Sequence, residues 1–465
     1  MTTVETSIEP LKIEFDSGAL VVHGVEEGNP REIPGLVLDP RTSEYRAEAI
    51  WYRRIIEYLD QRKIPFLDRA RTYKRTPWPL EIEKKPFPHQ TEALEAWRVA
   101  GKQGVVVLPT GTGKTHLAVM AIQMAERPSL IVTPTIDLMN QWSDELELGF
   151  GVEVGMLGGG SHRIEPLTVT TYDSAYQNVE KWGNRFGLVV FDECHHLPGP
   201  TYGLAARGAL APFRLGLTAT PERIDNAHEH LDVLIGPIVY RREITQLRGQ
   251  FLADYRVERL FADLGEEERA RYESSRILYR EFLSRSGIDM RRPGAWGQFL
   301  FAAYRSVEGK RAYLAYREQR MLALAAPKKL EILARLLDRH NGDRVIIFTN
   351  DNATVYTIAK RFLVPVITHQ TKAKERREVL QKFNDGSWPV VATSKVLNEG
   401  VNVPEANVAI ILSGSGSVRE HVQRLGRILR KSGDKEATLY EVVTRGTVEE
   451  FTSNRRRRHS AYESE

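Results

Sequence analysis

The chain has 465 residues, with 65 Lys and Arg against 61 Asp and Glu, and a net charge of +4. Its length predicts about three domains, and a hydrophobic share of 42% with 27% charged residues excludes a disordered or fibrous chain. The single cysteine, Cys194, excludes an internal disulfide and a cysteine-based zinc site, and it favours a reducing compartment. The first ten residues lack the apolar run of a signal peptide, and no stretch approaches the ~18 apolar residues of a membrane span. We therefore expect an intracellular protein with no membrane partner.

Residues 1–80 are predicted to form a small N-terminal α+β domain. Within Leu11 to Gly24, two short strands flank the turn signal Asp16-Ser17-Gly18. The segment Tyr45 to Leu59 is predicted to be helical because apolar residues recur four apart, at Ala47, Trp51, Ile55 and Leu59. The proline-rich sequence between Pro77 and Pro88 is interpreted as a linker.

Beyond the linker, short apolar runs alternate with helical segments in two separate series. Runs rich in Val, Ile and Leu that are separated by helices predict a parallel sheet covered on both faces. The first series is Val105 to Leu108, Ser129 to Val132, Leu167 to Thr171, Leu188 to Phe191 and Arg214 to Leu217. The second is Val345 to Phe348, Pro365 to Thr368, Val390 to Thr393, Val408 to Leu412 and Leu439 to Val442. Residues 264–326 between them are rich in Arg, Glu and Tyr, so we predict two α/β lobes with a helical insertion.

A phosphate-binding loop is predicted after the first strand of the first lobe. The sequence there is Pro109-Thr110-Gly111-Thr112-Gly113-Lys114-Thr115. Glycines let the backbone N–H groups curl around a phosphate, and the following helix N-terminus adds partial positive charge. Lys114 would reach the β- and γ-phosphates, and the Thr115 hydroxyl would bind Mg²⁺.

A second motif of this lobe is a buried strand that ends abruptly in acidic residues, Asp192 and Glu193. Strands of a doubly wound sheet deliver functional groups at their carboxyl ends. Asp192 is suited to hold Mg²⁺, and Glu193 is suited to act as the base that polarises an attacking water. His195 and His196 follow, but no third ligand supports a further metal site.

A third motif, Gln423-Arg424-Leu425-Gly426-Arg427-Ile428-Leu429-Arg430, lies in the second lobe. Arg427 and Arg430 share one face if the segment is helical, and guanidinium groups aimed at a γ-phosphate stabilise the charge of phosphoryl transfer. A solvated basic helix is the alternative for this segment alone. Together the three motifs predict a nucleotide hydrolase whose site closes between two lobes, with Gln423, Arg427 and Arg430 joining Lys114, Asp192 and Glu193 as catalytic residues.

The order and spacing of these motifs resemble those of superfamily 2 helicases over roughly residues 85–445. Further motifs of that superfamily are matched by Phe87-Pro88-His89-Gln90, Pro134-Thr135, Gln141-Trp142, Thr218-Ala219-Thr220, Phe348-Thr349, Thr393-Ser394 and Glu399-Gly400. Within the superfamily the chain most resembles the XPB helicase family in its compact archaeal form. The segments that carry this likeness are Thr171-Tyr172-Asp173-Ser174-Ala175-Tyr176, Asp192-Glu193-Cys194-His195-His196-Leu197-Pro198, Gly216-Leu217-Thr218-Ala219-Thr220 and Ser413-Gly414-Ser415-Gly416-Ser417.

The resemblance implies a domain plan and a set of ligands. The plan is a damage-recognition-like domain (1–80), a RecA-like ATP-binding lobe (81–245), a linker with a thumb-like helical insertion (246–327), a second RecA-like lobe (328–450) and a basic tail (451–465). ATP and Mg²⁺ are the implied cofactors. The residues implied to hold the nucleotide are Gln90, Thr110, Gly111, Thr112, Gly113, Lys114, Thr115 and Gly400, and those implied to contact nucleic acid are Thr135, Thr171, Arg223, Asp225, Thr349 and Ser394.

The implied activity is 3′-to-5′ movement on DNA in nucleotide-excision repair or promoter opening. The resemblance also implies a nuclease partner. We expect single-stranded, forked or damaged duplex DNA as the other partner, a monomeric state and a cytoplasmic, nucleoid-associated location. Two elements depart from the family pattern. The Arg-Glu-Asp element used in DNA opening appears as Arg223-Ile224-Asp225, and the Gly-x-Asp pattern appears as Gly400-Val401-Asn402.

Alternatives remain open at this level. Hydroxyls that follow a backbone do not distinguish DNA from RNA, so an RNA helicase of the same superfamily is one alternative. The other is an ATP-driven adaptor that positions a partner nuclease and unwinds weakly. Arginines of the insertion interleave with Tyr272, Tyr279 and Trp296, which predicts either base stacking or a mixed-charge surface over buried aromatics. The run Arg455 to Arg458 is interpreted as a disordered tail.

Overall fold

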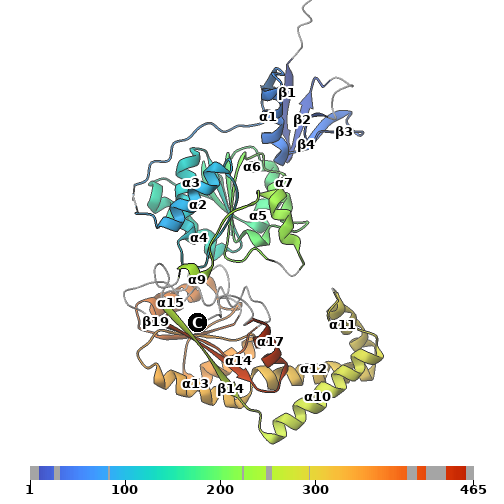
Figure 1. The fold of residues 1–465 in the computed structure, drawn as a ribbon, viewed down its shortest axis with the longest axis vertical. Helices are drawn as coiled ribbons and strands as arrows, with labels where there is room; N and C mark the ends of the chain where they lie inside the picture. The colour runs from blue at the N-terminus through green and yellow to red at the C-terminus, as the bar shows by residue number, and fades with distance from the viewer. Residues whose placement is uncertain are drawn as a thin grey trace, which may run out of the picture. The chain divides into compact units, whose positions relative to one another are not determined.

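The computed structural model describes residues 10–25, 32–81, 84–222, 225–247, 254–292, 294–394, 406–414 and 436–456. The chain divides into two compact units, one that ends at Glu243 and one that begins at Ile244 (Figure 1). Among the described residues, no helix is both long and apolar enough to cross a lipid bilayer.

The first unit opens with the small α+β domain that the sequence predicts. Its sheet has the strand order β3-β4-β2-β1-β5, and Ser17 and Gly18 form the predicted turn between the first two strands. Buried Ile13, Leu20 and Ile55 belong to its core. The elements are β1 (Leu11–Asp16), β2 (Ala19–His23), β3 (Val37–Asp39), β4 (Glu44–Glu48), the 3₁₀ turn η2 (Ala49–Trp51), α1 (Tyr52–Gln61) and β5 (Phe66–Asp68).

The helix predicted from Tyr45 begins later, at Tyr52, and this part of the prediction is wrong. Tyr45 lies in β4, where it pairs with Val22 of β2 and Leu38 of β3. Ala47 is buried in the strand, whereas Ile55 and Leu59 are buried on the helix. The apolar residues spaced four apart therefore belong to two different elements, a strand and a helix. The sequence pattern did not reveal the strand, because β4 is held by its pairing with β2 and β3.

The proline-rich segment after this domain is held against the first lobe. The Trp78 indole Nε1 donates a hydrogen bond of 2.7 Å to the carbonyl of Arg127, and Trp78 is buried. The backbone N–H of Thr76 donates to Glu126 O, and that of Glu81 donates to Gly149 O. The segment predicted as a linker is therefore fixed along the lobe over this stretch.

The first lobe is a parallel sheet with helices on both faces, and all the strands predicted here are present. Its strand order is β13-β6-β12-β11-β7-β10-β8-β9, and β9 alone is antiparallel to its neighbour. Helices α2–α4 and α5–α7 lie on opposite sides of the sheet (Figure 1). The strands are β6 (Gln103–Val107), β7 (Ser129–Thr133), β8 (Gly155–Gly158), β9 (Ser161–Arg163), β10 (Leu167–Thr171), β11 (Leu188–Asp192), β12 (Phe213–Thr218) and β13 (Ile238–Arg241). The helices and 3₁₀ turns are α2 (Pro88–Val99), α3 (Lys114–Ala125), α4 (Ile136–Phe150), α5 (Tyr172–Gln177), α6 (Val179–Trp182), η3 (Cys194–His196), α7 (Gly203–Arg207), η4 (Ala227–His230) and α8 (Leu231–Leu234).

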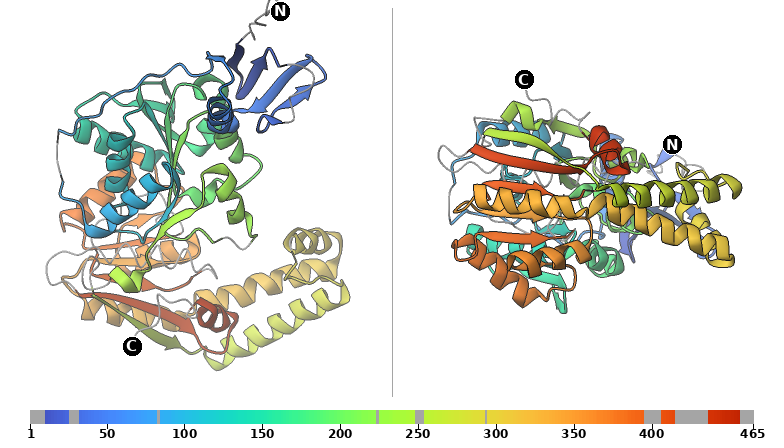
Figure 2. Two further views of the ribbon diagram at one scale, coloured as in Figure 1. Left: turned by 45° about the horizontal axis from the view of Figure 1, so that its top comes forward. Right: turned by 90° about the horizontal axis from the view of Figure 1, so that it is seen from below.

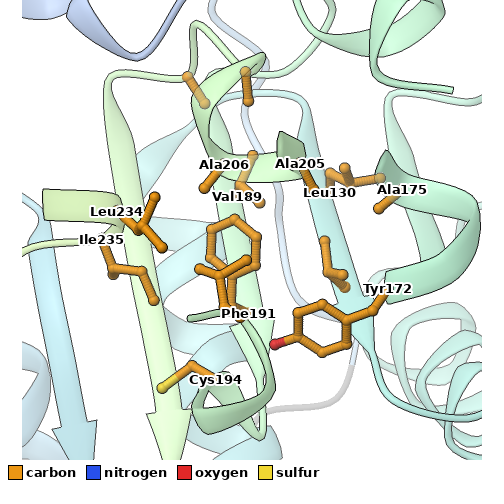
Figure 3. Packing of buried hydrophobic residues seen from close by; sticks show 14 of the residues in the cluster. Leu130, Tyr172, Ala175, Val189, Phe191, Cys194, Ala205, Ala206, Leu234 and Ile235 are labelled. Atoms are coloured by element: carbon orange, nitrogen blue, oxygen red, sulfur yellow. The ribbon is translucent and has the colours of Figure 1, made fainter. Parts of the chain in front are cut away.

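A buried cluster fixes the middle of this sheet against helices α5, α7 and α8. Figure 3 shows Val189 and Phe191 of β11 packed with Ala206 of α7, Leu234 of α8 and Tyr172 of α5. Burial of a large apolar side chain stabilises a fold by about 1.5–3 kcal/mol. The carboxyl end of β11, where the acidic motif begins, is thereby held in place.

The second unit contains the other parallel sheet, with the strand order β14-β19-β18-β15-β17-β16. The predicted strands are present, and β14 is an additional strand in the segment that the domain plan assigned to linker and insertion. It pairs with β19 from Asp254–Glu436 to Ala262–Thr444. The strands are β14 (Asp254–Ala262), β15 (Val345–Phe348), β16 (Val366–Ile367), β17 (Val390–Thr393), β18 (Val408–Ile411) and β19 (Glu436–Thr444). The helices outside the insertion are α9 (Ile244–Leu247), α13 (Pro327–Arg339), α14 (Asn352–Phe362), α15 (Ala373–Asn384) and α17 (Val448–Arg456).

The predicted insertion is helical, with α10 (Glu266–Arg285), α11 (Ala295–Arg305) and α12 (Val307–Leu324). Figure 2 shows α10 and α12 lying side by side, with α11 packed at their far end. The start of the predicted disordered tail is also helical, because α17 continues through Arg456.

A buried ion pair joins the last helix of the second lobe to α13. Lys329 Nζ lies 2.6 Å from Glu449 Oε2 and also donates to the carbonyl of Leu412, while the backbone N–H of Thr444 donates to the same carboxylate oxygen. Both charged side chains are only 2% exposed. The pair therefore links α13, α17 and the ends of two strands.

We expect Glu449→Ala to lower the free energy of unfolding of the second lobe by about 3–5 kcal/mol, because it leaves the Lys329 ammonium buried without its counter-charge. Urea unfolding followed by circular dichroism measures this change. The control is Glu331→Ala, which breaks the exposed Lys328–Glu331 pair on the same helix and is expected to cost less than about 1 kcal/mol. If the two variants lost the same free energy of unfolding, burial of the Lys329–Glu449 pair would not be the cause of its larger contribution.

Candidate functional site

The predicted phosphate loop connects β6 to α3 and requires glycine at two positions. Gly111 has a φ of 88° and Gly113 a φ of 80°, which is left-handed backbone that favours glycine. A Cβ at Gly113 would collide with the side-chain amide of Gln90. The Thr112 hydroxyl donates to the carbonyl of Pro109 at 2.8 Å. The loop is thus a fixed turn that opens directly onto the N-terminus of α3.

Gln90 of α2 is bonded directly to this loop. Its Nε2 donates to the carbonyls of Thr112 and Gly113 at 3.0 and 3.1 Å, and its Oε1 accepts from the backbone N–H of Phe87. His89 Nε2 lies 3.0 Å from the same Thr112 carbonyl. Contact of Gln90 with the nucleotide stays a prediction. His89 was not predicted, although it stands in the same motif.

The polar groups of the loop suit a bound phosphate. Lys114 Nζ donates to the loop's own carbonyls, Leu108 O at 3.1 Å and Pro109 O at 3.4 Å. The buried Thr110 hydroxyl has no hydrogen-bond partner among the described residues. Thr115 is the second residue of α3. Free backbone N–H groups and positive partial charge at this helix start complement a phosphate.

Asp192 and Glu193 lie at the carboxyl end of β11. Asp192 is 7% exposed, and its two carboxylate oxygens accept from Trp142 Nε1 at 2.8 Å and from the backbone N–H of Glu193 at 2.9 Å. Burial raises the pKa of Asp192, and the Trp142 hydrogen bond and the charge of Lys114 oppose that rise. Lys114 and Asp192 are therefore close enough to interact electrostatically, as the prediction of a shared site requires.

The acidic motif is connected to the next strand through His195. His195 Nδ1 lies 3.0 Å from Thr218 Oγ1 and 3.4 Å from Glu193 Oε2, and the backbone N–H of Thr220 donates to the same Thr218 hydroxyl. Glu193 has left-handed backbone, with a φ of 46°. These contacts connect the Asp192-Glu193 motif to Thr218-Ala219-Thr220, and the His195 side chain lies between the two motifs. The part of the chain that the structure describes contains no group of three or more His, Cys, Asp or Glu side chains suited to a metal ion.

The predicted nucleic-acid residues of each lobe gather at the carboxyl edge of its sheet. Thr135 and Thr171 cap α4 and α5, where their hydroxyls accept from the backbone N–H groups of Leu138 and Ser174 at 3.2 and 3.3 Å. In the second lobe, Thr349 and Ser394 directly follow β15 and β17 and are buried. Asp225 is exposed and accepts from the backbone N–H of Ala227. Helix capping accounts for the two threonine hydroxyls of the first lobe, and contact with nucleic acid stays a prediction for all five residues.

Five predicted site residues lie outside the described part of the chain. They are Arg223, Gly400, Gln423, Arg427 and Arg430. Their assignments stay predictions from the sequence.

The aromatic residues of the insertion divide between core and surface. Tyr272 is buried, and Tyr279 meets Phe299 edge-on at a ring distance of 5.3 Å, so both serve packing. Of the two alternatives that the sequence left open, the buried aromatic applies to Tyr272, because a ring that is 1% exposed offers no face to a base. Trp296 is 41% exposed and packs on Tyr316 at 5.0 Å.

Two hydrogen-bond donors to Asp192 were not predicted from the sequence. Trp142 stands in one of the further motifs of the superfamily, and it is buried and donates to the Asp192 carboxylate. The Tyr172 hydroxyl donates to the main-chain carbonyl of Asp192 at 2.9 Å. No local pattern signals these contacts, since Trp142 and Asp192 are fifty residues apart in sequence.

Three family descriptions match the chain. Residues 13–70 match the Xeroderma pigmentosum group B helicase damage recognition domain, residues 83–223 match the type III restriction enzyme res subunit, and residues 306–461 match the ERCC3/RAD25/XPB C-terminal helicase. A solved structure, the Hef helicase domain of Pyrococcus furiosus, superposes with a TM-score of 0.55 at 19% identity and covers 79% of this chain and 97% of that one. This likeness confirms the two-lobed helicase fold.

Named relatives are similar over most of the chain. The DNA 3′-5′ translocase XPB2 of Sulfurisphaera tokodaii is 40% identical over 425 residues, which is 91% of this chain and 96% of the relative. The DNA 3′-5′ helicase XPB of Kineococcus radiotolerans is 31% identical over 389 residues, which is 80% of this chain and 62% of the relative. The predicted family is confirmed: the chain belongs to the XPB family of superfamily 2 helicases.

Proposed function

We propose that this chain is an ATP-dependent DNA translocase and helicase that moves 3′ to 5′. The observation that carries the proposal is the position of two motifs at the carboxyl edge of one parallel sheet. The phosphate loop with Lys114 follows β6, and the Asp192-Glu193 motif ends β11, which is separated from β6 by β12 alone. The names of the two relatives, DNA 3′-5′ translocase and DNA 3′-5′ helicase, support the polarity and the choice of DNA.

The residues of the first lobe suit distinct steps of ATP hydrolysis. Lys114 would leave the loop carbonyls and bind the β- and γ-phosphates, and Glu193 would accept a proton from the attacking water. The donor set also fits Mg²⁺, because the Thr115 hydroxyl and the Asp192 carboxylate supply the oxygen ligands that this ion prefers. Bound there, Mg²⁺ would neutralise charge on the β- and γ-phosphates. Arg427 and Arg430 are proposed to stabilise the charge that develops on the γ-phosphate.

The proposal also includes the cellular process in which the chain acts. The match of residues 13–70 to a damage recognition domain supports a role in nucleotide-excision repair, with opening of DNA in transcription as the related task. We also propose a nucleoid-associated monomer that works with a partner nuclease. Damaged, forked and single-stranded DNA are the proposed substrates.

The test is ATP turnover measured at one fixed salt concentration with no nucleic acid, single-stranded DNA, forked duplex DNA or RNA. We expect stimulation by DNA that is strongest on forks. A repeat of the DNA measurements at a higher salt concentration should show weaker stimulation, because contacts to phosphates release counterions. Stimulation by RNA alone would assign the chain to RNA helicases instead. Flat turnover in all four conditions would favour the ATP-driven adaptor and would overturn the motor.

A further inference from the structure

Two buried aromatic side chains hold Asp192 from different elements. Trp142 of α4 donates its indole N–H to Asp192 Oδ2 at 2.8 Å, and Tyr172 of α5 donates its hydroxyl to the Asp192 main-chain carbonyl at 2.9 Å. Trp142 is 2% exposed and Tyr172 is 1% exposed. Figure 3 shows the Tyr172 hydroxyl directed toward the segment that carries Phe191 and Cys194. One donor thus fixes the rotation of the carboxylate, and the other fixes the backbone beneath it.

Each donor is joined to a residue that is predicted to contact the DNA strand. Thr135 caps α4, and Trp142 lies seven residues later on the same helix, which is about 10 Å along the helix axis. Thr171 caps α5, and Tyr172 is the first residue of that helix. The two predicted contacts are therefore connected to the same carboxylate by short helical segments.

These connections are stiff because both side chains are packed. Trp142 shares the buried face of α4 with Met139 and Leu146, so its indole moves only with the helix. The Tyr172 ring lies 5.4 Å from Tyr202 and 6.5 Å from Phe191. A shift of either helix cap would therefore be carried to Asp192 rather than absorbed by a side-chain rotation.

We infer that Trp142 and Tyr172 are positioning residues that transmit strand binding at Thr135 and Thr171 to the carboxylate of Asp192. This inference rests on the proposed function and deepens it, because it names the route by which DNA stimulates hydrolysis. A role in packing alone would require only the aromatic rings. The inference requires the indole N–H and the phenol O–H.

The test replaces each donor with phenylalanine, which keeps an aromatic ring and removes the hydrogen bond. We expect Trp142→Phe to lower DNA-stimulated kcat by about 10- to 100-fold, as is typical when a group supporting a metal-binding carboxylate is lost. The KM for ATP and the Kd for single-stranded DNA should change by less than about 3-fold, because neither ligand touches the indole. The Mg²⁺ concentration at half-maximal binding of a fluorescent ATP analogue, measured without DNA or turnover, should rise by about 10-fold.

Matched controls separate positioning from stability. Trp78→Phe removes another indole hydrogen bond of this lobe, to the Arg127 carbonyl, and Tyr52→Phe removes a buried phenol hydrogen bond to Asp68. Both should lose stability comparably to the test variants while keeping full DNA stimulation and an unchanged Mg²⁺ midpoint. Tyr172→Phe removes a single oxygen, and it tests the same inference if Trp142→Phe does not fold.

A double-mutant cycle tests transmission directly. If Trp142 transmits binding at Thr135, the losses of DNA stimulation in Thr135→Ala and Trp142→Phe should not add when the two are combined. The inference would be overturned if the losses of DNA stimulation were additive. It would also be overturned if Trp142→Phe and Tyr172→Phe kept full stimulation, or if the control variants lost stimulation equally. Full stimulation in these variants leaves the proposed motor intact, whereas wild-type protein that does not respond to DNA overturns the proposed function together with the inference.

Discussion

Replacing Lys114 with alanine is expected to lower the kcat for ATP by about 100- to 1000-fold, the cost of removing one preorganised donor from a developing negative charge. The Lys114 ammonium stands at the first residue of α3 and donates to two carbonyls of the phosphate loop. A γ-phosphate offers it a stronger, charge-assisted bond. ATP binding should weaken as well, because the lysine contacts the phosphates in the ground state. Single-turnover hydrolysis and binding of a fluorescent ATP analogue measure the two effects separately.

Lys102→Ala is the control for this variant. Lys102 lies in the same lobe, and its Nζ also donates to a main-chain carbonyl, that of Met124. Because Lys102 directly precedes β6, at the opposite end of the strand from the phosphate loop, its loss should leave turnover unchanged. Normal hydrolysis by Lys114→Ala would remove the phosphate loop from the proposed site.

The parallel sheets could be predicted from the sequence because their central strands are buried on both faces. Such strands require continuous apolar runs, as in Val345–Phe348, and those runs are visible without any knowledge of partners. The phosphate loop could be predicted for a similar reason. Its two left-handed glycines and the lysine at the helix start are local requirements, so they leave a local pattern.

The missed elements depend on partners that lie far away in sequence. Strand β14 lies at the edge of its sheet and mixes charged with apolar residues, and only its pairing with β19 reveals it as a strand. Glu44–Glu48 is a strand because β2 and β3 flank it. The hydrogen bond from Trp142 to Asp192 is of the same kind. A tryptophan in an amphipathic helix predicts burial, but not which acceptor its N–H will reach.

Glu193→Gln is expected to bind ATP normally and to hydrolyse it about 100- to 10,000-fold more slowly, which is the range for loss of a general base. Glutamine has the same shape as glutamate but cannot accept the proton of the attacking water. The side chain of Glu193 is 14% exposed, and its Oε2 lies 3.4 Å from His195 Nδ1. Binding of a fluorescent ATP analogue and a rapid-quench assay for released phosphate distinguish binding from chemistry.

The matched control for this variant is Glu126→Gln. Glu126 is also a glutamate with left-handed backbone in the first lobe, with a φ of 50° against 46° for Glu193. It ends α3 and accepts a hydrogen bond from Arg75 there, away from the phosphate loop at the other end of the helix. The backbone conformation is thereby held nearly constant, while the position of the carboxylate differs. If Glu193→Gln hydrolyses ATP as fast as Glu126→Gln, the base lies elsewhere, and His195 with Thr218 would then serve only to hold the two motifs together.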